Sequence, residues 1–185
     1  MARSSCRDAL VLLAIAAIAA GSGCSGKDPY RPGESIGAFH VTGKLVSTTC
    51  GTTPDPWEFD VKLRHDKTTL YWVQGDAPIS AVVDSAARAQ LKSTATQTVR
   101  AADARSRMAA CALERDDVLD LTLAPVAQPV DLQPTTSFTG TLTYHFTATD
   151  GSECEDQLAA SGGDYTTLPC DVSYTLTGKR TGDAK

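Results

Sequence analysis

The strongest constraint on the fold is an alternation of apolar and polar residues that recurs along the chain. It is clearest in SFTGTLTYHFTAT (137–149), CDVSYTLTGK (170–179) and WEFDVKLRH (57–65). Successive side chains of a strand point to opposite faces, so this period of two predicts strands with one dry face and one wet face. A single wet face is typical of antiparallel sheets, and the Thr, Val and aromatic residues favour a pleated surface.

Shorter alternating segments predict further strands at 38–50, 68–74, 79–83 and 111–123. In the first of these, Gly43 is expected to form a bulge. The second should pair with 57–65 through a short hairpin at Asp66 and Lys67. The last is expected to be two strands that turn at Asp116 and Asp117, because aspartate tolerates turn geometry.

The segment 84–100 is compatible with two kinds of structure. DSAARAQLKS (84–93) is compatible with a helix capped at Asp84 or Ser85, but TATQTVR (94–100) continues an alternation, so we expect a strand over this region. The segment 125–134 holds three prolines and is expected to connect two sheets. The prediction is an all-β domain of eight or nine antiparallel strands, folded as a sandwich or a meander barrel.

The start of the chain indicates export. Arg3 and Arg7 precede twelve apolar residues, 9–20, which is too short to span a bilayer but fits the apolar region of a signal peptide. Small residues, 21–23, then lead to Cys24. This arrangement resembles the lipobox of bacterial lipoproteins, which are cut before a cysteine that carries acyl chains. The mature domain resembles small secreted all-β lipoproteins.

The resemblance implies an order of parts along the chain. Residues 1–23 would be a signal peptide, 24–35 a lipidated tether, 36–180 the all-β domain and 181–185 a polar tail. Cys24 would hold the protein lastingly to a membrane, because it carries more than one acyl chain. The residue after Cys24 is Ser rather than Asp, which favours the outer membrane of a Gram-negative envelope.

Composition limits the partners. Removal of residues 1–23 leaves 15 basic and 21 acidic side chains, a formal charge of −6. An acidic domain of this kind argues against nucleic acid as a partner and against electrostatic adhesion to anionic lipid.

Four of the six cysteines remain once Cys6, in the leader, and the lipidated Cys24 are set aside. An even number in an exported domain predicts two disulfides among Cys50, Cys111, Cys154 and Cys170. Of the three possible pairings we expect Cys50–Cys111 and Cys154–Cys170, because the second closes a short local loop between two strands.

No catalytic, nucleotide-binding or metal-binding motif is present in the sequence. We therefore expect no cofactor and no metal. His40 and His145 could meet and bind a metal ion if their strands were neighbours, but solvated histidines are the simpler interpretation. The acidic segment 149–158 could hold calcium, but a solvated loop is the interpretation we favour.

Aromatic residues are the candidates for a ligand-facing cluster: Trp57, Tyr71, Trp72 and Tyr144. Such a stripe on strands usually belongs to the core. We expect a lipid-anchored, non-enzymatic envelope protein with a binding or structural role, whose partner is a small ligand, a glycan or another envelope protein. The alternative is an envelope hydrolase whose site no motif reveals.

Overall fold

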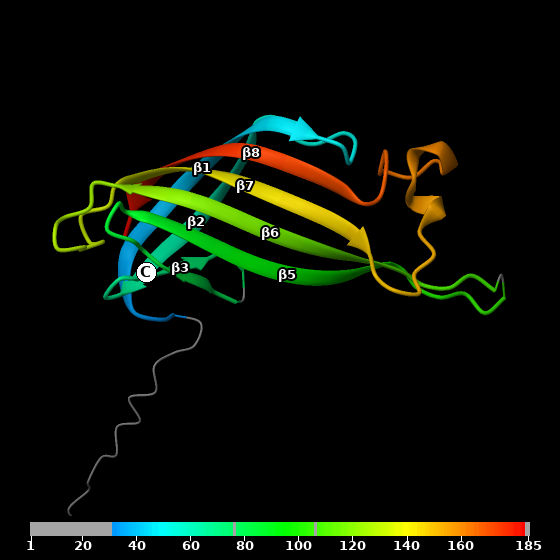
Figure 1. Ribbon diagram of the computed structural model, residues 1–185, viewed down its shortest axis with the longest axis horizontal. Helices are drawn as coiled ribbons and strands as arrows, with labels where there is room; N and C mark the ends of the chain where they lie inside the picture. Colours follow the sequence, from blue (N-terminus) through cyan, green and yellow to red (C-terminus); the bar gives the residue numbers. More distant parts are fainter. Residues whose placement is uncertain (1–30, 76, 106, 184–185) are drawn as a thin grey trace, which may run out of the picture.

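The computed structural model describes residues 31–75, 77–105 and 107–183, and the lipobox predicted at Cys24 lies outside these residues. The described chain forms eight strands and two short 3-10 helices (Figure 1). The strands are β1 (Glu34–Thr48), β2 (Trp57–Asp66), β3 (Thr69–Val73), β4 (Ile79–Val82), β5 (Arg88–Arg100), β6 (Cys111–Ala124), β7 (Ser137–Ala148) and β8 (Cys170–Gly182). The helices η1 (Glu155–Gln157) and η2 (Ala159–Ser161) lie between β7 and β8. No helix in the described part of the chain is long and apolar enough to cross a bilayer.

All eight strands belong to one antiparallel sheet with the order β4-β3-β2-β1-β8-β7-β6-β5. The first and last strands of the described chain pair with each other, so the two hairpin series join through β1 and β8. The ends of the sheet, β4 and β5, lie close together without forming a ladder, which leaves the barrel nearly closed. The all-β prediction is confirmed, and the meander barrel rather than the sandwich is the architecture.

The alternating residues fill the inside of the barrel, as predicted. Every second residue of β8, from Cys170 to Leu176, is buried, and β2 and β7 turn the same apolar sets inward. One end of the barrel is tightly packed around Phe39 and Phe138, whose ring centroids are 5.7 Å apart. Each such buried side chain stabilises the fold by about 1.5–3 kcal/mol.

The region 84–100 contains no helix: residues 84–87 form a turn, and the expected strand is β5, which begins at Arg88. Asp84 accepts hydrogen bonds from the backbone N–H groups of Ala86 and Arg88, so it caps a turn rather than a helix. The strand β5 then pairs with β6 along its whole length.

Three expectations about local structure are wrong. The segment 111–124 is one continuous strand, because Asp116 and Asp117 pair with β5 and β7 on either side instead of turning. The segment 125–134 connects β6 to its neighbour β7 within the same sheet, and its Leu132 is fully buried. Gly43 is paired regularly. A Cβ atom there would press on Leu176 and the Tyr174 ring, so close packing explains the glycine.

The four cysteines form two disulfides as predicted, but the expected pairing is wrong. Cys50 is bonded to Cys170 and Cys111 to Cys154, with Cα–Cα distances of 5.0 and 5.1 Å. Cys50 follows the end of β1 and Cys170 begins β8, and these two strands are neighbours. Cys111 begins β6 and Cys154 follows β7, which are also neighbours. Sheet pairing, not nearness in the chain, therefore decides which thiols meet.

Candidate functional site

The end of the barrel away from Phe39 and Phe138 is open, and three of the four aromatic residues singled out in the sequence line it. Trp72 also borders the packed end, because its ring centroid lies 5.6 Å from that of Phe138. Trp57 begins β2, Trp72 lies near the end of β3 and Tyr144 near the end of β7, all with their side chains inside the barrel. Tyr71 alternates to the outer face of β3 and does not line the cavities that contain Trp57, Trp72 and Tyr144. We call this open end the mouth.

Aromatic rings form the walls of the mouth. The ring centroid of Trp57 lies 4.4 Å from that of Phe59, 5.5 Å from Tyr174 and 6.0 Å from Tyr144. These separations are typical of tilted and edge-to-face contacts, which hold rings in fixed orientations. The walls are therefore apolar and well ordered.

A charged pair lies inside the mouth. Arg115 and Asp117, two residues apart on β6, point inward. The Arg115 Nε donates to Asp117 Oδ1 at 2.7 Å and Nη2 donates to Oδ2 at 2.8 Å. Ser93 Oγ donates a third hydrogen bond to Asp117 Oδ2 at 3.2 Å. The guanidinium carbon of Arg115 lies 4.8 Å from the centroid of the Tyr144 ring, in a cation–π contact.

Sequence reasoning missed this pair because it treated Asp116 and Asp117 as a turn. The signal was present in the alternation Leu113, Arg115, Asp117, Leu119, Leu121 and Leu123, which continues without a break. A strict period of two places the two charges on the apolar face. Two adjacent inward positions of opposite charge then indicate an ion pair inside the barrel.

Asp117 is the less exposed partner of the pair, and the surroundings of the pair shift the pKa values of Arg115 and Tyr144. The Asp117 side chain is 14% exposed and that of Arg115 is 42% exposed. Burial alone lowers the pKa of Arg115, but the hydrogen bond and negative charge of Asp117 outweigh it and leave that pKa raised. Burial, followed by the charge of Asp117, raises the pKa of Tyr144 above its ordinary value. At neutral pH the mouth therefore holds a charged guanidinium and a protonated phenol.

Three cavities meet at Arg115. A cavity of about 360 Å³ lies toward Trp72, Leu119 and Leu142. A second, of about 340 Å³, lies toward Phe146, Tyr165 and Tyr174, and Trp57 and Tyr144 form a shared wall between the two. A third, of about 80 Å³, lies beside Ala95 and Gln97 of β5.

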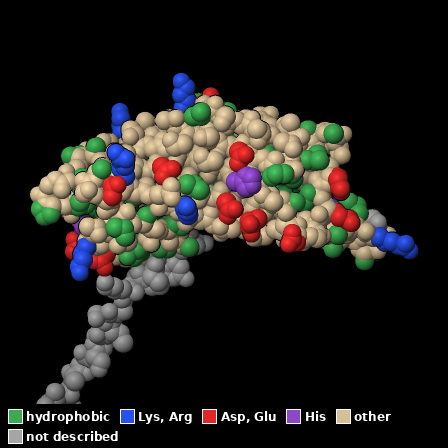
Figure 2. Space-filling view, viewed as in Figure 1, with side chains coloured by type: hydrophobic (Ala, Val, Ile, Leu, Met, Phe, Trp, Pro, Cys, Tyr) green, Lys and Arg blue, Asp and Glu red, His purple; other side chains and the backbone are tan. Residues whose placement is uncertain are grey.

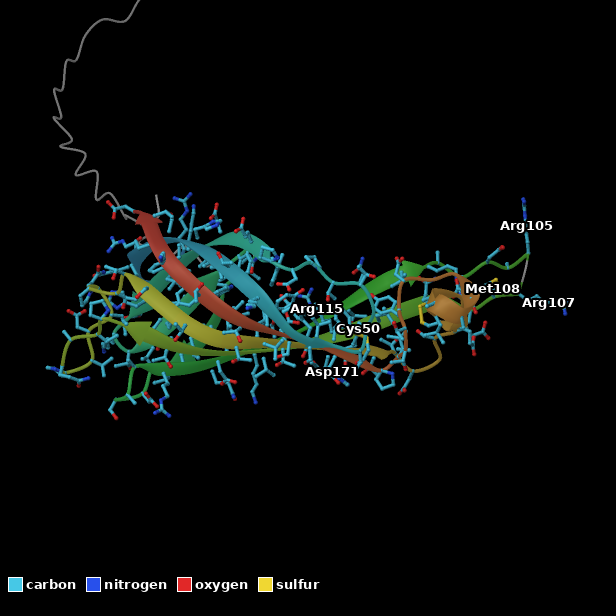
Figure 3. All side chains as sticks on the ribbon, turned by 90° about the horizontal axis from the view of Figure 1, so that it is seen from above. Cys50, Arg105, Arg107, Met108, Arg115 and Asp171 are labelled. Carbon is cyan, nitrogen blue, oxygen red and sulfur yellow. A yellow bond between two sulfur atoms is a disulfide. The ribbon has the colours of Figure 1, made fainter. Side chains whose placement is uncertain are left out.

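Unequal strand lengths explain why the barrel is open here. The strands β5 to β8 continue past the mouth, whereas β3 ends at Val73 and β4 begins at Ile79. The wall is therefore high on one side and low on the other. Figure 3 places Arg115 midway along the molecule, between the packed end of the barrel and the hairpin tip that carries Arg105 and Arg107.

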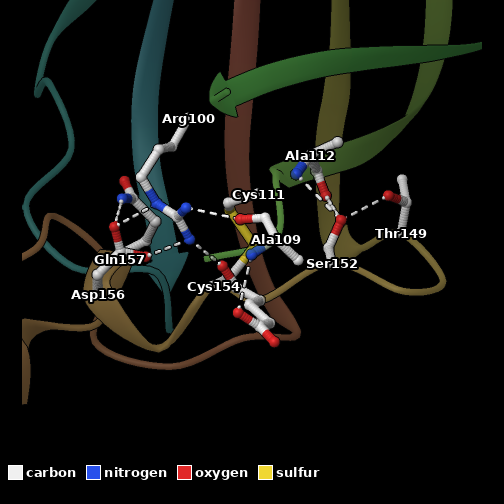
Figure 4. The surroundings of a disulfide bond; sticks show 10 residues. Arg100, Ala109, Cys111, Ala112, Thr149, Ser152, Cys154, Asp156 and Gln157 are labelled. Atoms are coloured by element: carbon white, nitrogen blue, oxygen red, sulfur yellow. Dashed lines mark hydrogen bonds and ion pairs between the residues drawn. A yellow bond between two sulfur atoms is a disulfide. The ribbon is translucent and has the colours of Figure 1, made fainter. Parts of the chain in front are cut away.

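A separate network ties the segment after β7 to the β5–β6 hairpin (Figure 4). The Arg100 guanidinium donates to the Asp156 carboxylate at 2.8 Å and to the backbone carbonyls of Ala109 and Glu153 at 2.6 Å each. Glu153 also accepts from the backbone N–H of Ala109 at 3.0 Å. The hydrogen bond from Arg100 holds the pKa of Asp156 below its usual range. Two acidic groups of the suggested calcium loop thus bind protein donors next to the Cys111–Cys154 disulfide.

The histidines on the strands do not meet. His40 pairs with Asp60 at 2.9 Å, and His145 pairs with Asp171 at 2.7 Å, all on the outer surface. On β8, the neighbours of His40 and His145 are Lys179 and Asp171, which places the two imidazoles roughly 26 Å apart at the usual rise per strand residue. Figure 2 shows a histidine among acidic side chains on one such face. The described residues contain no cluster of three or more potential metal ligands.

The fold and site together define an eight-stranded antiparallel meander barrel with an aromatic mouth around an internal arginine–aspartate pair. No family model, curated protein or solved structure matches the chain.

Proposed function

We propose that this protein is a lipid-anchored, non-enzymatic binding protein of the bacterial cell envelope that holds a small ligand in the mouth of its barrel. The observation that carries the proposal is the pair of cavities of about 360 and 340 Å³ that share Trp57, Arg115 and Tyr144 as walls. Small-molecule sites are typically concave and apolar with a few polar groups, and the mouths of barrels are common places for them.

The envelope part of the proposal rests on the sequence and the disulfides. The lipobox-like segment ends at Cys24, and two disulfides suit an oxidising compartment outside the cytoplasm. Attachment through Cys24 would connect the barrel to the outer membrane through the tether, residues 24–35. The test of this part is metabolic labelling with radioactive palmitate in a Gram-negative host followed by membrane fractionation. Cys24→Ser should abolish the label and release the protein from the outer membrane; unchanged labelling and partition would refute the anchor.

The binding part is tested by equilibrium dialysis of the full lipidated chain in lipid nanodiscs, with empty nanodiscs subtracted. The probes are small naphthalene derivatives, which match the apolar walls. Tyr144→Ala should weaken binding at least tenfold, because it removes a wall common to both large cavities. Tyr71→Ala is the matched control, since it removes the same side chain from the outer face of β3. Equal effects of the two changes, or no binding by the unaltered protein, would overturn the proposal and favour a passive structural role.

A further inference from the structure

Resting on the proposed function, we propose that the mouth selects ligands with a carboxylate on a compact apolar body, and that the free end of the Arg115 guanidinium holds this carboxylate. The argument starts from the hydrogen-bond donors of Arg115. A guanidinium has five N–H groups, of which Nε and one on Nη2 are used by Asp117. None of the described residues accepts a hydrogen bond from Nη1.

The position of the guanidinium is set by its surroundings. Asp117 accepts two hydrogen bonds from one edge of the guanidinium and a third from the Ser93 hydroxyl. The Tyr144 ring lies against one face at 4.8 Å. The remaining edge, Nη1 with the second N–H of Nη2, presents two nearly parallel N–H groups. This fork matches the two oxygens of a carboxylate, and little side-chain freedom is left to lose on binding.

Two further polar groups of the mouth are free donors. The Tyr144 hydroxyl and the Trp57 indole N–H have no hydrogen-bond partner among the described residues, and both residues line the two large cavities. The raised pKa of Tyr144 keeps its hydroxyl protonated. Two carboxylates line these cavities: Asp117, which already accepts three hydrogen bonds, and Asp164, which lines only the cavity toward Tyr165. A ligand that enters the cavity toward Trp72 therefore meets free donors at Arg115, Tyr144 and Trp57 and must supply acceptors.

The charge and the size of the mouth further restrict the class of ligand that fits it. Asp117 offsets the positive charge of Arg115, so selection comes from two directed hydrogen bonds rather than from a net positive field. The apolar walls and cavities of a few hundred Å³ suit a body of one or two rings, and the partial exposure of Arg115 allows the carboxylate to stay in contact with water.

The test compares three probes with the same ring system: 2-naphthoate, its neutral amide 2-naphthamide, and the cation 2-naphthylmethylammonium. Binding to the full chain in nanodiscs is measured by equilibrium dialysis. The naphthoate should bind at least tenfold more tightly than the amide, and the cation should bind most weakly. The variant Arg115→Gln/Asp117→Asn removes both charges together, so no buried carboxylate is left unpaired; it should bind naphthoate and amide equally. Arg88→Gln, an exposed arginine on β5, is the matched control and should keep the preference.

The outcomes separate this inference from the proposed function. If the amide and naphthoate bind equally to the unaltered protein, and Tyr144→Ala abolishes both, the mouth binds ligands but Arg115 does not select them. If the double variant keeps the preference for naphthoate while its melting temperature shows that it folds, another group holds the carboxylate. If no probe binds, both proposals fail.

Discussion

Cys50 and Cys170 are 120 residues apart in the chain and are bonded because β1 and β8, the first and last strands, lie side by side. This disulfide links the two strands whose pairing joins the two halves of the barrel. The second disulfide, Cys111–Cys154, spans 43 residues and joins β6 to the segment that follows β7. Both bonds fasten neighbouring strands near the mouth.

Removing either disulfide should destabilise the barrel. On the chain-entropy argument, Cys50→Ser/Cys170→Ser should cost about 5 kcal/mol of unfolding free energy and Cys111→Ser/Cys154→Ser about 4 kcal/mol, as upper values. Urea denaturation of the two double variants measures these losses. Peptide mapping without reduction provides the independent check, and a linked peptide containing Cys50 with either Cys111 or Cys154 would contradict the structure.

Most features that depend on local sequence were predicted correctly, whereas features that depend on contacts between residues far apart in the chain were not. Alternation is local, so it predicted the strands and the inward faces of Trp57, Leu142 and Tyr174. Disulfide pairing and barrel closure depend on β1 meeting β8, a contact between the two ends of the chain that no local pattern contains. The expected bond Cys154–Cys170 followed sequence distance, and sheet topology overruled it.

The site was only partly predictable for a related physical reason. Trp57, Trp72 and Tyr144 were found from their alternation, since a strand's period assigns the face. The mouth itself was not found, because it arises from the short β3 and β4 standing opposite longer strands. Arg115 and Asp117 were missed because composition suggested a turn, although the period of two placed them inside.

Close packing at Gly178 gives a prediction about the closed end of the barrel. A Cβ atom on this residue of β8 would overlap the Phe138 ring, its partner on β7. Gly178→Ala should therefore cost about 2 kcal/mol of unfolding free energy, as overpacking commonly does. Chemical denaturation measures the loss.

A matched control and a double-mutant cycle test the cause. Gly182→Ala adds the same methyl group at the end of β8, where nothing lies within 4 Å, and should leave stability unchanged. Phe138→Leu frees space beside Gly178, so the double variant should lose less than the sum of the two single variants. Strict additivity would show that the ring is not the obstacle.

The Arg100 network should control the order of the segment after β7. Arg100→Lys leaves a positive charge but cannot reach Asp156, Ala109 and Glu153 together, because an ammonium lacks the planar fork. Amide hydrogen exchange across 149–169 should become at least tenfold faster, while exchange in β1 and β2 stays unchanged. Arg88→Lys, at an exposed position, is the control, and equal exchange in both variants would refute this role for Arg100.

The raised pKa of Tyr144 predicts a loss of stability at high pH. Burial keeps the phenol protonated in the folded protein, whereas an unfolded tyrosine ionises near pH 10. Above about pH 10 the unfolded chain releases a proton that the folded chain retains, so the unfolding free energy falls as pH rises toward the folded pKa. Tyr165 and Tyr174, whose pKa values burial also raises, should contribute to the same fall.

Tyr144→Phe isolates this contribution. The hydroxyl has no hydrogen-bond partner among the described residues, so its removal should change the unfolding free energy at pH 7 by less than about 0.5 kcal/mol. Between pH 10 and 12 the unfolding free energy of the variant should fall less steeply than that of the unaltered protein, as followed by urea denaturation at each pH. Tyrosinate absorbance in the folded state should also show one late-titrating group fewer. Identical slopes for the two proteins would mean that the Tyr144 phenol ionises as freely in the barrel as in the unfolded chain.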